Sequence, residues 1–222
     1  MNRVRPRVAI VDYGLGNLFS VKQACEHAGM TATITSARVD VLAAAAVVLP
    51  GVGAYGDAMA TLHKLDLVGV LRDVAAAQKP LVGICLGMQL LMTESYEFGR
   101  HAGLDIIAGA VVPFDHPGEN GRALKVPHVG WNHIDAVRPW DETPLSGITD
   151  GARMYFVHSY VVQPHDSGVV VSTSRYGQVE FCSSLRYRNV FACQFHPERS
   201  GVEGLRVYAN LAHHLSALGD EQ

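Results

Sequence analysis

The chain has 222 residues, of which 48% are hydrophobic and 18% charged, so it can bury one sizeable core, and a single domain over residues 1–222 is expected. The formal net charge is −3 and the chain has no basic run, which argues against a nucleic-acid partner. The N-terminus lacks a signal-peptide pattern, no segment is apolar enough to span a membrane, and the four cysteines show neither a C-x-x-C pair nor zinc-finger spacing. These features predict a cytoplasmic protein with free thiols, no structural zinc and no membrane contact.

The first half of the chain alternates short apolar runs with helix-like segments. The apolar runs, expected to be buried strands, are residues 7–12, 31–35, 45–50 and 80–84, and the helix-like segments are residues 17–29 and 56–77. The Val, Ile and Leu content of the runs suits burial on two faces, and Gly29 suits the end of the first helix. This alternation predicts an α/β fold with a mostly parallel central sheet flanked by helices.

The second half has a different texture, with many short β-prone runs between about residues 111 and 194. Gly, Pro, Asp and Asn separate these runs, which include YFVHSYVV, GVVVSTS, QVEFCSSL and NVFACQF. They predict a smaller antiparallel or mixed sheet, followed by a final helix over about residues 202–215. The segment PFDHPGENGR at residues 113–122 is the strongest candidate for a mobile loop.

Three glycines after the third apolar run raise the question of a nucleotide site. Gly51, Gly53 and Gly56 fit the G-x-G-x-x-G spacing of a dinucleotide-binding turn. In such a fold the next strand ends in an acidic residue that binds the ribose hydroxyls, but here it ends at Cys85. Pro50 also removes a backbone N–H from a loop that needs such donors. The pattern therefore argues against a nucleotide-binding oxidoreductase.

Cys85 lies at the predicted junction of a buried strand and an amphipathic helix, between Gly83 and Gly87. This is the G-x-nucleophile-x-G pattern of a nucleophile elbow, in which small neighbours allow a sharp turn that exposes the reactive side chain. A thiol at a helix N-terminus is also stabilised as thiolate by the helix dipole. We therefore predict a nucleophilic role for Cys85, and a packing role for Cys25, Cys182 and Cys193.

A cysteine nucleophile needs a base, and the stretch FACQFHPERSG offers one. His196 follows a predicted strand that Pro197 ends, and the carboxylate of Glu198 is near enough in sequence to orient the imidazole ring. A nucleophile, a histidine and a carboxylate together form the triad of covalent acyl-transfer enzymes.

Acyl transfer also needs N–H donors for the negative charge that develops on the carbonyl oxygen. The backbone of Leu86, directly after the nucleophile, would supply one donor. Val52 or Gly53 would supply the second, because the loop PGVG follows a neighbouring strand. The opening glycines are thus predicted to form an oxyanion hole.

Together these motifs resemble the class I glutamine amidotransferase family. The motifs that match are G-x-C-x-G-x-Q at residues 83–89, P-G-x-G at residues 50–53 and H-P-E at residues 196–198. Within the family, the chain most resembles the members that supply ammonia for histidine biosynthesis. The stretches that carry this resemblance are DYGLGN, PGVGAYGDAM, KVPHVGWN and YFVHSY. It covers the chain nearly end to end and implies a flavodoxin-like fold without a cofactor.

The resemblance implies a role for each matching residue. Cys85 would attack the carboxamide of L-glutamine and form a γ-glutamyl thioester, His196 would protonate the ammonia and then activate water, and Glu198 would orient His196. The residues that match positions holding the two ends of glutamine in similar proteins are Gln89, Glu97, Ser159 and Tyr160.

The resemblance also implies a heterodimer with a (βα)8-barrel cyclase, to which the ammonia passes through a protein channel. The candidate interface residues are Asn17, Trp131, Tyr155 and Arg199. The family usually has lysine where Arg199 stands, and arginine presents a planar fork to the barrel in place of a compact ammonium. The alternatives are a glutaminase for another acceptor, as in anthranilate or pyridoxal phosphate synthesis, and a non-catalytic module on the same fold.

Overall fold

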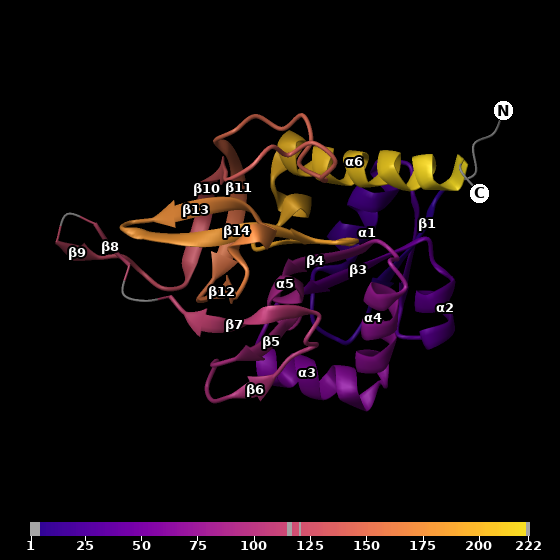
Figure 1. Cartoon of the computed structure of the whole chain (residues 1–222), viewed down its shortest axis with the longest axis horizontal. Helices are drawn as coiled ribbons and strands as arrows, with labels where there is room; N and C mark the ends of the chain where they lie inside the picture. The colour runs from indigo at the N-terminus through magenta and orange to yellow at the C-terminus, as the bar shows by residue number, and fades with distance from the viewer. Residues whose placement is uncertain (1–4, 115–116, 120, 221–222) are drawn as a thin grey trace.

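The computed structural model describes residues 5–114, 117–119 and 121–220, so the segment predicted as a mobile loop lies partly outside the described residues. Its centre is a nine-stranded sheet in the order β11-β10-β13-β14-β15-β4-β3-β1-β2 (Figure 1). These strands are β1 (Arg7–Val11), β2 (Thr31–Thr35), β3 (Ala46–Gly51), β4 (Leu81–Cys85), β10 (His128–Ala136), β11 (Ala152–His158), β13 (Val170–Tyr176), β14 (Val179–Tyr187) and β15 (Val190–Cys193).

Helices cover both faces of the parallel part of this sheet. They are α1 (Leu18–His27), α2 (Arg38–Ala43), α3 (Tyr55–Lys64), α4 (Leu67–Ala76) and α6 (Gly201–Asp220). Figure 1 shows α1 and α6 on one side of β1, β3 and β4, with α3 and α4 on the other. The predicted α/β fold with helices flanking a central sheet is confirmed.

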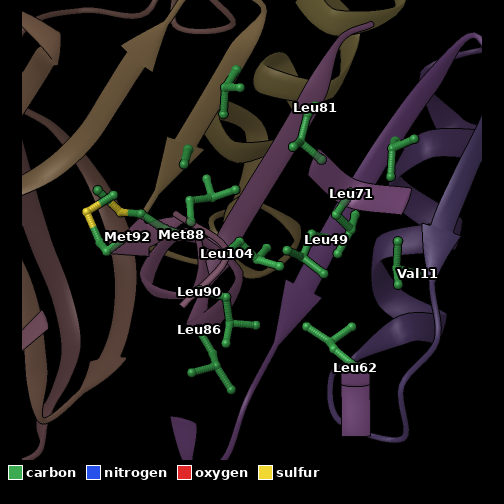
Figure 2. Close-up of a cluster of buried hydrophobic side chains, with 14 of the residues drawn as sticks. Val11, Leu49, Leu62, Leu71, Leu81, Leu86, Met88, Leu90, Met92 and Leu104 are labelled. Atoms are coloured by element: carbon green, nitrogen blue, oxygen red, sulfur yellow. The ribbon is translucent and has the colours of Figure 1, made fainter. Parts of the chain in front are cut away.

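Successive residues of β1 point into two different core clusters, which explains why the sequence of the strand is continuously apolar. Val8 and Ile10 lie in the core cluster that includes side chains of α1 and α6. Ala9 and Val11 lie in the second cluster, with side chains of α3 and α4 (Figure 2). Both faces of the strand are therefore buried, as the sequence pattern predicts for a parallel sheet.

The helical region after β3 differs from the prediction of one helix over residues 56–77. The structure has two helices, α3 and α4, separated at Leu65 and Asp66. Asp66 adopts a left-handed conformation with φ of 54°, which breaks the helix without a glycine or proline. The break changes the direction of the chain, and both helices bury apolar side chains against the sheet. The six-residue helix α2 was not predicted.

The strands of the second half contribute to three sheets. Through β15, the strands β14, β13, β10 and β11 continue the central sheet in antiparallel fashion. A smaller mixed sheet is present as predicted, with the order β12-β7-β5-β6, and consists of β5 (Met92–Ser95), β6 (His101–Ala102), β7 (Ile107–Pro113) and β12 (Tyr160–Pro164). Of the runs predicted to form it, however, only the end of YFVHSYVV does so, as β12; the others pair with the central sheet. A two-stranded sheet pairs β8 (Gly118–Glu119) with β9 (Arg122–Ala123).

The parallel register brings the predicted motifs to one edge of the sheet. Gly51 at the end of β3 pairs with Cys85 at the end of β4, and Cys193 at the end of β15 pairs with Ile84. The carboxyl ends of three adjacent strands thus converge, which is where open α/β sheets place their sites. Among the helices of the described residues, none offers a stretch long and apolar enough to cross a lipid bilayer.

Candidate active site

The chain turns sharply at Cys85, which has φ of 54° and ψ of −109°. A Cβ added at Gly87 would overlap the carbonyl oxygen of Leu49, and one added at Gly83 would lie 3.0 Å from the backbone N of Met88. Gly87 leaves no room for a Cβ and Gly83 leaves very little, so the two flanking glycines permit the close packing of β3, β4 and the following turn. The predicted elbow geometry is confirmed.

The helix after the elbow is not the predicted amphipathic one. It is α5 (Leu86–Leu90), five residues long, and all five residues are buried. Its leucines and methionine belong to the core cluster in Figure 2, because the smaller sheet covers the face that was expected to meet solvent. A helix of little more than one turn sums few peptide dipoles, which reduces the predicted dipole effect on Cys85.

His196 and Glu198 form a buried pair at the end of β15. Nδ1 of His196 lies 2.8 Å from Oε1 of Glu198, and the two side chains are 4% and 1% exposed. The backbone N of His196 donates to the carbonyl of Tyr155 at 2.9 Å, while Ser200 Oγ donates to the carbonyl of His196 at 2.6 Å. These contacts fix the ring, and the carboxylate determines that Nδ1 carries a proton.

Burial by itself lowers the pKa of His196, but interactions with Cys85 and Glu198 outweigh it and raise the pKa to about 10. The effect of Cys85 on this pKa is chiefly electrostatic, because Nε2 of His196 has no hydrogen-bond partner of ordinary geometry among the described residues. In contrast, burial raises the pKa of Cys25 and Cys182 to about 12. Those two thiols stay protonated at neutral pH, in agreement with a packing role.

A pocket of about 260 Å³ opens at the elbow, and the residues predicted for substrate and oxyanion binding surround it. Its lining includes Val52, Gly53, Cys85, Leu86, Gln89, Glu97, Ser159 and Tyr160, together with Val157 and His158. A larger cavity of about 500 Å³ between α6 and β15 has none of these residues in its lining. The predicted nucleophile and the predicted binding residues all line the 260 Å³ pocket, so we take that pocket as the candidate active site.

Two of the four residues predicted to hold glutamine, Gln89 and Glu97, have side chains that already bond to the protein. Both N–H groups of Gln89 donate, to the carbonyl of Tyr160 and to Oε1 of Gln194, each at 3.1 Å. Only the amide oxygen of Gln89 remains to accept from a ligand. The carboxylate of Glu97 accepts from the backbone N of Tyr55, at the first residue of α3. Glu97 therefore stabilises a helix N-terminus in addition to lining the pocket.

Three of the four predicted interface residues form one surface cluster. Trp131 is 49% exposed on β10 and meets the ring of Tyr155, its partner on β11, at a centroid distance of 6.2 Å. The guanidinium of Arg199 lies 4.6 Å from the centre of the same ring. Asn17 precedes α1, which contacts the turn that contains Arg199. The planar fork of arginine thus stacks on an aromatic face.

The sequence matches the family model described as "Glutamine amidotransferase class-I" over residues 9–214. The chain belongs to the class I glutamine amidotransferases. It is accordingly an enzyme with glutamine amidotransferase activity. Among curated relatives, the imidazole glycerol phosphate synthase subunit HisH of Rhodopirellula baltica is 45% identical, with 92% of this chain and 96% of the relative covered. The subunit of the same name from Syntrophotalea carbinolica is 49% identical over 91% of this chain and 98% of the relative.

Solved structures of low sequence identity share the fold of this amidotransferase. A crystal structure titled only as a glutamine amidotransferase has a TM-score of 0.70 at 18% identity, covering 95% of this chain and 98% of that one. The PurLQS structure from Thermotoga maritima has a TM-score of 0.69 at 20% identity, covering 96% of this chain and all of that one. In the part of the amidotransferase that the structure describes, no cluster of three or more His, Cys, Asp or Glu side chains is placed to hold a metal ion.

Sequence reasoning missed several residues that support the amidotransferase site. The hydroxyl of Tyr13 donates to the carbonyl of Pro50 at 2.7 Å, and a Cβ at Gly51 would overlap that hydroxyl. Tyr13 thereby anchors the start of the loop that holds the predicted oxyanion donors Val52 and Gly53. The motif DYGLGN contains Tyr13, but its spacing gives no sign of a contact 37 residues away. Gln194 was missed although it lies two residues before His196.

Two buried histidines beside the pocket form a hydrogen-bonded chain with one consistent proton arrangement. Nδ1 of His158 donates to the carbonyl of Tyr160 at 3.0 Å, so its Nε2 must accept from Nδ1 of His128 at 3.0 Å. Nε2 of His128 then accepts from the amide of Asn132 at 3.4 Å. Burial lowers the pKa of His128 to about 4 and that of His158 to about 3, so both rings are neutral.

The neutral pair predicts a loss of stability of the amidotransferase in mild acid. Both pKa values lie below the ordinary value of 6.5, so the unfolded chain binds protons that the folded chain does not, and the free energy of unfolding falls as the pH drops from 6.5. Each histidine contributes about 1.4 kcal/mol per pH unit to this slope. His196 has a raised pKa, so its contribution is complete below pH 6.5 and lost only as the pH rises toward 10.

The measurement is urea unfolding of the wild type and His128→Gln at pH 6.5 and pH 5. The variant is expected to lose about half of the slope, because one of the two titrating rings is gone. His27→Gln, on the exposed surface of α1, is the matched control and should keep the full slope. Equal slopes in wild type and His128→Gln would contradict the assignment of neutral buried rings.

Proposed function

We propose that this amidotransferase is the glutaminase subunit of an imidazole glycerol phosphate synthase. It would hydrolyse L-glutamine to glutamate and ammonia and pass the ammonia to a (βα)8-barrel cyclase. The observation that carries the proposal is that Cys85, which lines the pocket, interacts with His196, and that His196 is paired with the buried carboxylate of Glu198. Relatives named as this subunit share 38–49% identity over about nine-tenths of this chain.

In this mechanism the sulfur of Cys85 attacks the carboxamide carbon of glutamine. Once the thiol proton has passed to Nε2 of His196, the imidazolium, which the raised pKa of His196 favours, protonates the leaving nitrogen. The C–N bond breaks, ammonia leaves and a γ-glutamyl thioester remains. His196, now neutral, takes a proton from water, the hydroxide attacks the thioester carbon, and glutamate leaves as the thiolate reforms. Glu198 keeps Nδ1 protonated throughout, so that Nε2 exchanges the proton.

The partner would dock on the face that holds Trp131, Tyr155 and Arg199. An exposed tryptophan packed on a tyrosine, with a guanidinium stacked beside it, combines the residue types that dominate binding energy at protein interfaces. These side chains lie on β10, β11 and the turn after His196. An ammonia acceptor docked there would be close to the strands that line the glutamine pocket.

Trp131→Ala tests the proposed partner. Loss of a central aromatic contact is expected to weaken the affinity for the (βα)8-barrel cyclase of the same organism at least about thirtyfold, corresponding to roughly 2 kcal/mol. Isothermal titration calorimetry of the two purified proteins measures this. Val39→Ala removes a 72% exposed apolar side chain on α2 instead and should bind like the wild type. Unchanged affinity in Trp131→Ala would show that the interface lies elsewhere on the chain. If the wild type did not bind the cyclase at all, the proposed partner would be rejected.

A further inference from the structure

The side chain of Gln194 lies between the nucleophile and the wall of the glutamine pocket. Gln194 follows β15 directly and is 0% exposed. Its Nε2 donates to Cys85 Sγ at 3.6 Å, and its Oε1 accepts from Gln89 Nε2 at 3.1 Å. Because Gln89 also donates to the carbonyl of Tyr160, one chain of hydrogen bonds connects the pocket wall to the reacting sulfur.

The amide of Gln194 has only one orientation that satisfies its neighbours. Gln89 presents N–H groups to it, so Gln194 must turn its oxygen toward Gln89 and its nitrogen toward Cys85. The backbone N of Gln194 donates to the carbonyl of Ser183 at 2.9 Å, which fixes the residue at the strand end. A buried amide is unfavourable unless its polar atoms are paired, and here the pairing fully determines where the donor points.

The two hydrogen-bond contacts of Cys85 Sγ act in opposite directions. The carbonyl oxygen of Val157, 3.7 Å from Sγ, can only accept, so it favours the protonated thiol. The amide of Gln194 donates, so it favours the thiolate. Since an amide does not titrate, this donor stays in place while the proton moves between Cys85 and His196.

We propose that Gln194 is a positioning residue, which donates to the sulfur of Cys85 and holds the amide of Gln89 against the glutamine pocket. Through the first contact it sets the fraction of reactive thiolate, and through the second it sets the shape of the substrate wall. The inference rests on the proposed function only in taking Cys85 as the nucleophile. Its readout is the reactivity of that thiol, which is measured without glutamine turnover.

Two variants of the full chain test the role. Gln194→Met keeps the side-chain length but removes the donor and the acceptor. Gln194→Glu keeps an acceptor for Gln89 and, as a carboxylate, places a negative charge in place of the donor. The rate of Cys85 alkylation by iodoacetamide, followed by mass spectrometry from pH 5 to pH 10, gives the midpoint of thiolate formation. We expect the midpoint to rise by about one pH unit in Gln194→Met and by more in Gln194→Glu.

The control is Ser172→Ala, which removes a buried hydroxyl from the serine network of β13 and β14 without contact to Cys85. It should lower stability and leave the alkylation midpoint unchanged. In Gln194→Met the KM for glutamine should also rise, since Gln89 loses its acceptor. A folded Gln194→Met or Gln194→Glu variant with the wild-type alkylation midpoint would overturn the proposal. The proposed glutaminase function is tested separately: glutamine turnover by a variant without Cys85 would reject that function.

Discussion

Replacing Cys85 with alanine or serine is expected to abolish glutamine-dependent synthesis by the complex and to leave synthesis from added ammonium salts intact. The nucleophile is needed only to release ammonia, and the acceptor chemistry would occur in the partner. Removal of a nucleophile at such a triad reduces turnover by roughly 10⁶-fold, so glutamine-dependent activity should fall below detection. The assay compares product formation with glutamine and with ammonium chloride, using the same preparation of chain and cyclase.

Cys182→Ala is the matched control for this experiment. Cys182 is also a buried cysteine at a sheet strand, but its pKa of about 12 keeps it protonated, so both activities should persist. Loss of both activities in Cys85→Ser would mean that Cys85 is structural or that the cyclase does not act alone. Retained glutamine-dependent turnover would reject Cys85 as the nucleophile.

Short local motifs made much of the site predictable. Gly83, Cys85 and Gly87 predict a sharp strand-to-helix turn because adjacent residues determine it, and the structure has that turn. The spacing of His196 and Glu198 likewise predicts a pair that two residues of chain bring together. In each case the physical cause lies within a few residues, where a single sequence carries the information.

Features that depend on distant contacts were not predictable in the same way. No glycine or proline ends α3 at Lys64, and Asp66 takes a left-handed conformation between two helices that both face the sheet. The full burial of α5 depends on the smaller sheet that covers it. The contact of Gln194 with Cys85 joins residues 109 positions apart, so only the pairing of β15 with β4 brings them together.

The second large effect concerns the oxyanion loop. We expect the isolated chain to have little glutaminase activity, and the partner with an acceptor analogue to raise it at least about a hundredfold. A glutaminase that ran alone would waste glutamine, and one peptide orientation suffices to control it. If the donor at Val52 or Gly53 points away, the transition state loses roughly 3 kcal/mol of stabilisation, which is a hundredfold in rate. Glutamate release by the chain, with and without the cyclase and analogue, measures the stimulation.

The structure supplies a physical basis for such a flip. Gly53 has φ of 115°, a conformation that L-residues rarely adopt, and a Cβ there would lie 3.5 Å from Leu15 Cδ2, an ordinary contact distance. Strain rather than a clash therefore limits Gly53→Ala. The bond from Tyr13 to the Pro50 carbonyl holds the start of the loop, and rotation of the peptide between Val52 and Gly53 would leave this bond intact. Such a rotation would carry φ of residue 53 from the positive to the negative range.

Gly53→Ala is expected to reduce the stimulation because alanine disfavours the positive φ. If the described orientation is the resting one, alanine raises the basal rate; if it is the active one, alanine lowers the stimulated rate. In both cases the ratio of stimulated to basal glutaminase falls, by about fivefold or more for a strain of 1 kcal/mol or above. Gly29→Ala is the matched control, since Gly29 has φ of 88° with open space around it and lies beyond α1. Both variants carry similar backbone strain, so a ratio that falls only in Gly53→Ala assigns the switch to the oxyanion loop. Wild-type stimulation in Gly53→Ala would rule the flip out, and so would full glutaminase activity of the isolated chain.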